Sequence, residues 1–591
     1  MKYIYLTTIL LALTTIQCNQ KSQPDPETNR IFNEYLEQKF DEGLQRNPEF
    51  ASSLGFRYQY GAWTDRSFEN SRNELKISEQ ILDSLKDFDL TKLDSQSILS
   101  LRLFEEDVKN RKEALKWEGY SYELHQMGGV VTDMPAFLIN VHAVDSLADA
   151  EAYLSRLAKY QIPFRQTISN LNYSKSIGVV PPAFTMHYVQ ESIDGMASGL
   201  AKADNNDLLN DFSAKVDKLS IDATKKMELK TQAKKLIADS VLMAYQNMSS
   251  FWKEYAKSTA KSEGVWSLPK GDAYYTYCLK ANTTLDLTPE EVYQTGLKEV
   301  ARIHDEMRKI MKIVKFKNDS LQAFFDFVRN DAQFQYTNDE SGRKALLSDA
   351  TNYFEATNKR LKDIFNIMPK APCVVMAVEK FREKSVGGAF YENPTLDGKR
   401  PGRYYVNCYN MKDNPKYQME ALTAHEAIPG HHMQIAIAQE LTGIPNFRKH
   451  GGNTAYIEGW ALYSELLNKE LGFYQDPYSD FGRLSMEIFR AARLVVDVGI
   501  HTKKWTREQA IDYFVKNTAN AKGDIDHEIE RYFLWPGQAT GYKIGMLKIM
   551  ELREKSKKQL GDKFDIRKFH DIVLQNGSVP LNVLEELVLK N

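Results

Sequence analysis

Residues 423–440 read TAHEAIPGHHMQIAIAQE. Many zinc peptidases carry the pattern HExxH, in which two histidines four residues apart project from one helical face toward one ion. Here Pro429 stands where the second histidine would be, and the next histidines, His431 and His432, follow His425 by six and seven residues. The question is whether this stretch is a zinc site with two extra residues or a helix that happens to carry histidines.

The Pro-Gly pair at 429–430 predicts a break in the helix. Proline lacks a backbone N–H, and its ring clashes with the carbonyl group four residues earlier, which belongs to His425. Gly430 then permits backbone angles that other residues resist. Along an unbroken helix, His425 and His432 would lie about 10.5 Å apart, too far to share one ion. We expect the helix to open or bulge so that His431 approaches His425, with His432 as the alternative ligand.

A base and a third metal ligand also stand in suitable places. Glu426, adjacent to His425, is a candidate general base toward a metal-activated water. A second helical stretch, YIEGWALYSELLNKEL, supplies Glu458 as third ligand, 27 residues after His431. Glu465 lies two turns further along the same face, either as a competing ligand or as a partner that holds a ligand. Two histidines and one carboxylate suit a single zinc ion.

The composition of the whole chain excludes some functions. It has 591 residues, 42% hydrophobic and 26% charged, with a formal net charge of −2. Without a basic excess, the chain lacks the electrostatic pattern of nucleic-acid binding. Cys278, Cys373 and Cys408 are too few and too widely spaced for a disulfide scaffold, and the absence of CxxC argues against a cysteine metal site.

The N-terminus predicts export. Residues 1–18, MKYIYLTTILLALTTIQC, have Lys2, then an apolar run too short for a stable membrane span, then Cys18. This pattern is typical of a bacterial lipoprotein signal, so we expect lipidation of Cys18 after cleavage and membrane contact only through that lipid. Gln17 replaces the usual small residue, which leaves plain secretion as the alternative. With residues 19–29 as a polar tether, the protein would lie in the periplasm or at the cell surface.

Most of the remaining chain is expected to be helical. Residues 220–257 lack proline and glycine, and Thr288 and Thr506 each open a capping box. Near the histidine motif, residues 389–391 (AFY) and 403–409 (RYYVNCY) flank a turn rich in proline and glycine, which predicts a β-hairpin. We therefore expect a mainly α protein with a small β-hairpin or sheet beside the metal site.

Four segments together resemble a known family: HEAIPGHHMQ, IEGWALYSE, DGKRPGRYYVN and ERYFLWPGQATGYKIG. They are similar to a bacterial family catalogued as domain of unknown function 885, over about residues 30–591. That family is similar to helical zinc peptidases of the angiotensin-converting, thimet-oligopeptidase and carboxypeptidase Taq types. The resemblance implies two helical lobes flanking a deep substrate channel. It also implies His425 and a second histidine as zinc ligands, Glu458 as third ligand and Glu426 as base.

We expect the chain to divide at a soft boundary near residue 270. Residues 30–270 would form an N-terminal helical half, and residues 271–591 the half that carries the metallopeptidase chemistry. No obvious linker separates the two.

The segment SMEIFRAARLVVDVGIHTKKW (485–505) places charged side chains on one helical face. Arg493, Asp497 and His501 recur every four residues. Asp497 is a candidate to orient His501 or a ligand histidine, His501 to stabilise an oxyanion, and Arg493 to bind substrate. An internal ion-pair ladder in a core helix is the alternative.

The segment 530–545 carries further candidates for substrate contacts. The related peptidases use a late tyrosine toward the tetrahedral intermediate, and the resemblance implies Tyr542 for this role, with Tyr532 in reserve. Arg531 is a candidate to bind a substrate carboxylate through paired N–H groups, which would favour action at a C-terminus. An ion pair with Glu528 or Glu530 is the alternative.

The predicted hairpin has a possible role of its own. Its edge strand, with Phe390 and Tyr391, is a candidate to pair with an extended peptide by adding that peptide to the sheet. A hairpin that merely covers a helix is the alternative.

Together these patterns predict an exported zinc metallopeptidase that hydrolyses oligopeptides, with one zinc ion and Glu426 as general base. One alternative is a zinc-dependent amidase or hydrolase acting on a modified or non-peptide substrate. Another is a non-catalytic surface-binding lipoprotein with a structural metal, against which Glu426 weighs because a structural site needs no base. The sequence leaves open whether cleavage is internal or at a chain end.

Overall fold

The computed structural model describes residues 23–202, 205–259, 261–380, 383, 387–395, 398 and 400–590. The predicted signal and the lipidation site Cys18 lie outside these residues, as do residues 19–22 of the tether. Within the described chain we find no helix with the length and hydropathy of a membrane span. Cys278, Cys373 and Cys408 are free thiols in the described part of the chain.

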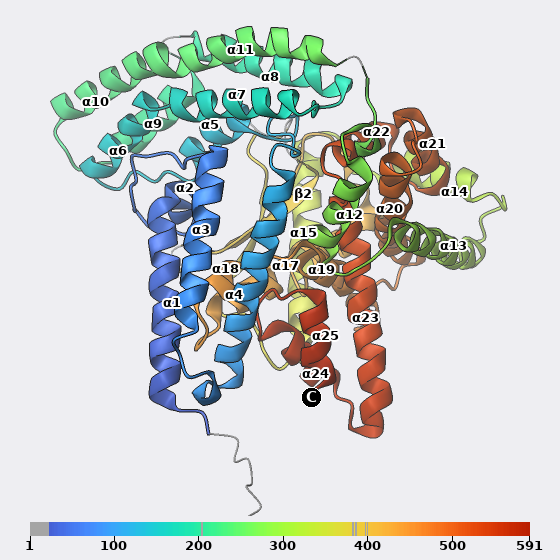
Figure 1. The fold of residues 1–591 in the computed structure, drawn as a ribbon. Helices are drawn as coiled ribbons and strands as arrows, with labels where there is room; N and C mark the ends of the chain where they lie inside the picture. Colours follow the sequence, from blue (N-terminus) through green and yellow to red (C-terminus); the bar gives the residue numbers. More distant parts are fainter. Residues whose placement is uncertain are drawn as a thin grey trace, which may run out of the picture.

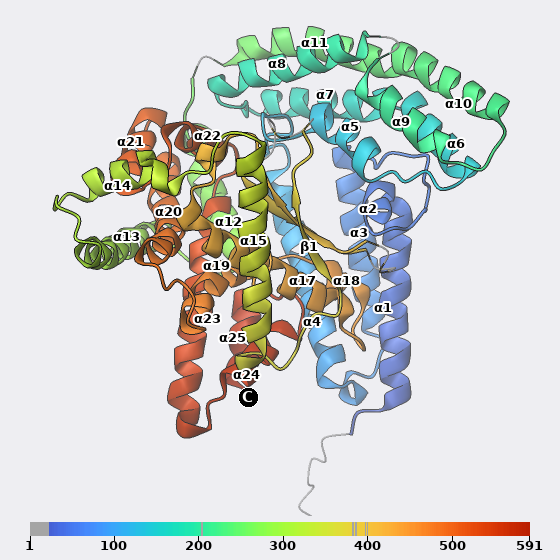
Figure 2. The same ribbon diagram turned by 180° about the vertical axis from the view of Figure 1, so that it is seen from behind.

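The predicted mainly helical character is confirmed (Figure 1). The chain opens with α1 (Pro26–Arg46), α2 (Pro48–Ser53), α3 (Phe68–Leu85) and α4 (Ser95–Ala114). A layer lies across one end of α1, α3 and α4, as Figures 1 and 2 show from opposite sides. It contains α5 (Val130–Asn140), α6 (Leu147–Ala158), α7 (Gln161–Ser176), α8 (Ala183–Leu200), α9 (Asp207–Asp217), α10 (Ala223–Leu236) and α11 (Met243–Tyr255).

The second part of the chain continues with α12 (Gly271–Thr283), α13 (Pro289–Ile313), α14 (Leu321–Asn330) and α15 (Glu340–Arg360). After the strands come α16 (Met419–Glu426), α17 (His431–Glu440), α18 (Asn446–His450), α19 (Thr454–Glu470) and α20 (Pro477–His501). The last helices are α21 (Arg507–Asn517), α22 (Lys522–Leu534), α23 (Gly541–Leu560), α24 (Ile566–Leu574) and α25 (Leu581–Leu589).

Helix starts follow from local sequence. The capping boxes predicted at Thr288 and Thr506 are confirmed at the first turns of α13 and α21. Each box gives partners to backbone N–H groups that the start of a helix leaves unpaired. The proline-free run 220–257 forms α10 and α11, which a π-helical segment at Ile237–Leu242 joins.

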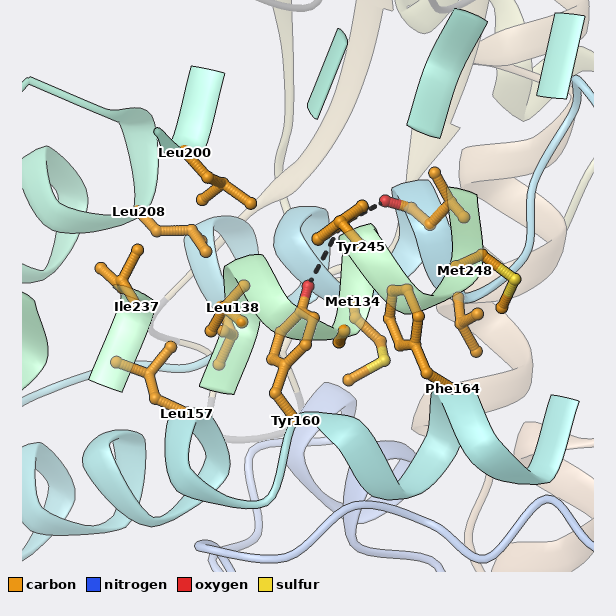
Figure 3. Close-up of a cluster of buried hydrophobic side chains, with 14 of the residues drawn as sticks. Met134, Leu138, Leu157, Tyr160, Phe164, Leu200, Leu208, Ile237, Tyr245 and Met248 are labelled. Carbon is orange, nitrogen blue, oxygen red and sulfur yellow. Dashed lines mark hydrogen bonds between the residues drawn. The ribbon is translucent and has the colours of Figure 1, made fainter. Parts of the chain in front are cut away.

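The layer α5–α11 has a hydrophobic core of its own (Figure 3). The hydroxyl of Tyr245 donates to the carbonyl oxygen of Val131 at 2.6 Å, and the hydroxyl of Tyr160 lies 3.4 Å from that of Tyr245. Buried tyrosines need such partners because an unpaired hydroxyl costs free energy in an apolar interior. Apolar side chains such as Met134 and Phe164 therefore fill this core together with the hydrogen-bonded tyrosines Tyr160 and Tyr245.

The N-terminal helices also pack against the end of the chain. Leu99 of α4 belongs to the buried cluster formed by α19, α23, α24 and α25. Beside it, Arg102 of α4 pairs with Glu586 of α25 at 2.7 Å. The boundary predicted near residue 270, where α12 begins, stays a prediction, and so does the division into two lobes around a channel.

A small mixed sheet lies next to α16 and α17. The predicted hairpin is confirmed: β2 (Ala389–Glu392) pairs antiparallel with β3 (Gly402–Val406). Added to this hairpin is β1 (Cys373–Ala377), which pairs parallel with β3, so that the order is β1-β3-β2. The central strand buries Tyr404 and Val406 against α15, which fixes the sheet on the helical body.

Two glycines set the crossing of α19 and α23. A Cβ added to Gly545 would lie 1.8 Å from the carbonyl oxygen of Ala455, and one added to Gly459 would lie 2.5 Å from the backbone of Gly545. Only glycine allows this approach, because any side chain would overlap the opposite helix. The close contact between α19 and α23 also positions two site residues. Glu458 lies next to Gly459 on α19, and Tyr542 lies one turn before Gly545 on α23.

Candidate metal centre

The helix break predicted at the Pro-Gly pair is confirmed. One helix, α16, ends at Glu426, and α17 begins at His431. Between them the backbone folds tightly, since a Cβ on Gly430 would lie 1.9 Å from the carbonyl oxygen of His425. The indole N–H of Trp460 on α19 donates to the carbonyl oxygen of Pro429 at 2.8 Å. These contacts hold the two helix ends against α19.

The break brings His425 and His431 together, with Glu458 facing both. The imidazole centroids lie 4.8 Å apart with the rings nearly perpendicular. The Nε2 atoms of His425 and His431 lie 3.7 Å and 3.6 Å from the same oxygen, Oε2 of Glu458. Two ligand atoms bound tetrahedrally to zinc at about 2.1 Å stand about 3.4 Å apart. The spacing therefore fits one zinc ion, and the three residues offer ligand atoms all within 4.8 Å of one another.

The electrostatics of this cluster favour a positive charge. Burial disfavours the imidazolium form of His425, but Glu458 and Glu465 outweigh that effect and raise the pKa of His425 to about 9. Burial likewise opposes ionisation of Glu458, yet its contacts with His425 and His431 hold the pKa of Glu458 well below its usual range. A site that stabilises a cation between these groups is suited to a metal ion.

Glu465 holds the first histidine in place. Its Oε1 atom accepts a hydrogen bond from Nδ1 of His425 at 2.9 Å, and the carboxylate is 1% exposed. A carboxylate on the outer nitrogen fixes the ring orientation and directs Nε2 toward the metal position. Of the two roles expected for Glu465, the geometry is that of a partner of the ligand.

The structure brings His431 to the cluster and turns His432 away from it. Nε2 of His432 lies 3.1 Å from the carbonyl oxygen of Ala371, and Nδ1 lies 2.9 Å from the hydroxyl of Tyr391. With a carbonyl at Nε2, this nitrogen carries the proton and Nδ1 accepts from Tyr391. Burial lowers the pKa of His432 to about 4, which keeps the ring neutral. Both nitrogens of His432 are thus occupied.

The same contacts place the predicted hairpin residues. Tyr391 ties β2 to α17 through His432, and Phe390 stacks on Tyr405 of β3 with ring centroids 4.9 Å apart. A Cβ on Gly402 would lie 2.5 Å from the Tyr391 hydroxyl, so glycine makes room for this contact. In the sheet, β2 is an edge strand.

Glu426 and Tyr542 flank the ligand cluster. Glu426 ends α16 and is buried, and its charge helps to favour the protonated form of His425. Burial, followed by the charge of Glu458, raises the pKa of the Tyr542 phenol. The ring of Tyr542 packs on the guanidinium of Arg493 at 4.6 Å. No other described residue hydrogen-bonds the Tyr542 hydroxyl, so it is free to donate to a bound molecule.

Arg531 and Tyr532 are held in a buried network. Nη1 of Arg531 pairs with Glu528 at 3.0 Å, and Arg493 donates both to Glu528 at 3.0 Å and to the Tyr532 hydroxyl at 2.9 Å. The hydroxyl of Tyr532 in turn donates to Glu528 at 2.8 Å. Gln538 takes a further hydrogen bond from Arg531. The alternative expected for Arg531, an ion pair with Glu528, is what the structure shows.

Asp497 and His501 tie helices together away from the ligands. Asp497 accepts hydrogen bonds from the Tyr275 hydroxyl at 2.6 Å and from the backbone N–H of Gly537 at 3.0 Å. Nδ1 of His501 accepts from the backbone N–H of Val265 at 3.2 Å, and Nε2 donates to a backbone carbonyl at 2.9 Å. Burial raises the pKa of Asp497 to about 7 and lowers that of His501 to about 4.

These partners do not fit the roles expected for the two residues. The expected pairing of Asp497 with His501 is absent from the described chain, because each is saturated by other groups. Since His501 has no free N–H, it cannot donate to an oxyanion. The alternative, an internal ion pair, holds for Arg493, which pairs with Glu528, whereas Asp497 and His501 link α20 to α12 and to the backbone of neighbouring segments.

Sequence reasoning missed Arg490. This side chain is 9% exposed, and its Nη2 atom lies 3.9 Å from Oε1 of Glu465. Arg490 precedes Arg493 by three residues on α20, so the two share a helical face. The sequence analysis considered only charged residues four positions apart, so it did not include Arg490. A search that also considered residues three positions apart would have found it.

A comparison with protein families identifies the chain. The model of a family described as bacterial protein of unknown function (DUF885) matches residues 48–588. The chain belongs to this family. The predicted resemblance to DUF885 is confirmed, while the similarity to helical zinc peptidases stays a prediction. No curated protein matches the chain.

Two solved structures have the fold of this DUF885 chain. A "putative lipoprotein" from Colwellia psychrerythraea is 32% identical, with a TM-score of 0.90 over 95% of this chain and 99% of that one. A "putative lipoprotein of unknown function" from Shewanella oneidensis is 19% identical, with a TM-score of 0.73 over 94% of this chain and 99% of that one. The second likeness concerns the fold alone.

Proposed function

We propose that this protein is an exported, lipid-anchored zinc peptidase that hydrolyses oligopeptides. The observation that carries the proposal is the convergence of His425, His431 and Glu458 from three helices, with Glu426 beside them. The similar solved structure described as a "putative lipoprotein" and the N-terminal pattern ending at Cys18 support export and anchoring. In this proposal the peptide lies in a channel between two helical lobes.

Each side chain of the site has a role in the proposed reaction. A zinc ion, when bound, supplies Lewis acidity that acidifies water and polarises a carbonyl group. Glu426 accepts the proton of the attacking water and passes it to the leaving amine. The free hydroxyl of Tyr542 donates a hydrogen bond to the oxyanion that develops on the scissile carbonyl. Glu465 keeps Nε2 of His425 directed at the cluster.

Metal analysis of histidine variants tests the site, and His432 provides a matched control. His425→Ala and His431→Ala should each lose stoichiometric zinc. His432→Ala should keep it, since both nitrogens of His432 are engaged by Ala371 and Tyr391. Unchanged zinc content in both ligand variants would refute the metal centre. Zinc loss in His432→Ala with retention in His431→Ala would reverse the assignment of the second ligand.

Glu426→Gln separates metal binding from catalysis. The variant should retain zinc but hydrolyse a mixed peptide library about 10²–10⁴-fold more slowly, because it lacks the proton acceptor. Wild-type protein loaded with zinc that cleaves no peptide in the library would contradict the peptidase proposal. Equal turnover by wild type and variant would remove Glu426 from the mechanism.

A further inference from the structure

Three buried arginines lie around Tyr542, next to the metal cluster. Arg490 and Arg493 lie one turn apart on α20, and Arg531 lies on α22. They are 9%, 5% and 8% exposed, respectively. Removing a guanidinium from water is costly unless an anion and full hydrogen bonding compensate it. Each of these side chains therefore calls for a negative partner.

The described carboxylates do not provide one for each arginine. Glu528 is shared between Arg493 and Arg531. Arg490 reaches only Oε1 of Glu465, at 3.9 Å, and that oxygen already bonds His425 at 2.9 Å. In the described part of the chain, Arg490 has no carboxylate of its own.

Arg490 and Arg493 also lack hydrogen-bond acceptors for some of their N–H groups. The one hydrogen bond that Arg490 makes in the described chain runs from Nη1 to the carbonyl oxygen of Met486, on its own helix, at 3.1 Å. Its Nε atom and Nη1 of Arg493 are buried without a hydrogen-bond partner among the described residues. Other buried arginines, such as Arg448 and Arg553, also carry one unpaired donor, but Arg490 and Arg493 are neighbours on one helix, and each such donor calls for a bound water, an ion or a ligand.

The two guanidinium groups that carry these unpaired donors lie near the proposed reaction site. The guanidinium of Arg493 lies 4.6 Å from the ring centroid of Tyr542, and the charges of Arg490 and Arg493 both act on the Tyr542 phenol. On the other side, Arg490 approaches Glu465, which holds the ligand His425. The excess positive charge thus lies between the residues around the metal position and the proposed oxyanion donor. Glu458, whose charge also acts on Tyr542, keeps 21% of its side chain exposed, so solvent reaches this side of the cluster.

We infer that Arg490 and Arg493 bind the C-terminal carboxylate of a peptide substrate, so that the enzyme removes residues from the C-terminus. This inference rests on the proposed peptidase function. A carboxylate supplies the missing charge and accepts two N–H groups from a guanidinium at once, which a C-terminal amide does not. An N-terminal ammonium would be repelled by the same groups. Arg531 is excluded from this role because Glu528 and Gln538 hold it and, unlike Arg490 and Arg493, it is not among the described residues with a buried unpaired donor.

Paired peptides test the inference directly. Two N-acetylated peptides of identical sequence, one with a free C-terminal acid and one with an amide, are incubated with zinc-loaded protein. The acid should be cleaved with a kcat/KM at least about 30-fold higher than that of the amide. The amide lacks the negative charge, and loss of one partner of a buried charge pair has an effect of this size. Mass spectrometry should show loss of C-terminal residues. Equal cleavage of both peptides would overturn the inference and leave the peptidase proposal standing, whereas cleavage of neither would count against the peptidase proposal itself.

Variants assign the preference to the arginines. Arg490→Gln should lower kcat/KM for the acid at least about 30-fold, mainly through KM, and bring the acid-to-amide ratio toward one. Arg46→Gln removes an ion pair with Glu74 between α1 and α3, across the molecule in Figure 1, and should leave that ratio unchanged. Zinc content and circular dichroism report whether each variant is folded. An equal fall for both peptides in Arg490→Gln would overturn the assignment.

Binding measured without turnover tests the carboxylate preference independently of catalysis. Titration calorimetry on the Glu426→Gln protein compares an N-acetylated dipeptide acid with its amide. The acid should bind at least tenfold more tightly, and adding Arg490→Gln should abolish the difference. Equal affinity for acid and amide in the Glu426→Gln protein would overturn the inference.

Discussion

Replacing Gly545 with alanine tests the helix crossing that brings Tyr542 beside Glu458. The new Cβ would lie 1.8 Å from the carbonyl oxygen of Ala455 and 2.8 Å from the Cα of Gly459. Non-bonded heavy atoms prefer separations of about 3.5 Å, so α19 and α23 would have to separate by roughly 1.5 Å. The obstacle is backbone, which a side-chain rotation cannot remove.

The expected cost follows from this overlap. Overpacking of a well-packed core lowers the free energy of unfolding by about 1–3 kcal/mol. Replacing a helical glycine with alanine returns about 0.5–1 kcal/mol, because the unfolded chain loses freedom. We expect Gly545→Ala to lower the free energy of unfolding by about 1–2 kcal/mol, because backbone overlap places it toward the upper end of the overpacking range. A displacement of about 1 Å between Tyr542 and Glu458 should also reduce kcat about 100-fold.

Urea unfolding followed by circular dichroism measures the stability change. Gly195→Ala is the matched control, since Gly195 lies within α8 and a Cβ there meets nothing within 4 Å. The control should unfold at the same or a slightly higher urea concentration than wild type. If Gly545→Ala unfolded together with this control and kept full activity, the glycine contact would not be what positions Tyr542.

Three further changes probe the site and its supports. Burial raises the pKa of Asp497 to about 7 in the folded chain, so the wild-type protein loses stability as pH rises from about 4 to 7 and this carboxyl ionises. Asp497→Asn lacks this loss, and its free energy of unfolding should therefore rise by about 2.5 kcal/mol relative to that of wild type between about pH 5 and pH 8. A parallel pH dependence of urea unfolding in both proteins would contradict this. Glu465→Gln should weaken zinc affinity about 10–100-fold in chelator competition, because His425 loses its charged partner; unchanged affinity would show that Glu465 is dispensable. Trp460→Phe removes the hydrogen bond to Pro429 and should lower the free energy of unfolding by about 1–3 kcal/mol in urea titration, whereas no change would mean that water replaces the indole.

Local patterns in the sequence were sufficient to predict the secondary-structure elements around the site. The capping boxes, the hairpin and the break at Pro429 depend on groups within a few residues of one another, so short-range sterics and hydrogen bonds decide them. Pro429 interrupts the helix because it removes an N–H and its ring clashes with the carbonyl of His425. The parallel strand β1 was not predicted, since it joins the hairpin across a long connection and has no local signal.

Contacts between distant segments explain where sequence reasoning stopped. Asp497 and His501 share a helical face, yet each is saturated by a partner more than 30 residues away, such as Tyr532 for His501. Arg531 has a nearby carboxylate in Glu528, and the sequence could not show that Arg493 shares it. Pairing of buried charges depends on which helices pack together, and helical periodicity does not contain that information.

The sequence by itself predicted that the chain is mainly helical, that its motif helix breaks at the Pro-Gly pair, and that His425, Glu426 and Glu458 lie in one candidate site. The tertiary structure alone decided between the adjacent histidines. His431 meets His425 because the backbone at Gly430 folds against α16, and His432 then points to Tyr391 on β2. Consecutive side chains on a helix diverge by about 100°, so the packing of α19 on one side and the sheet on the other sends the two imidazoles in different directions.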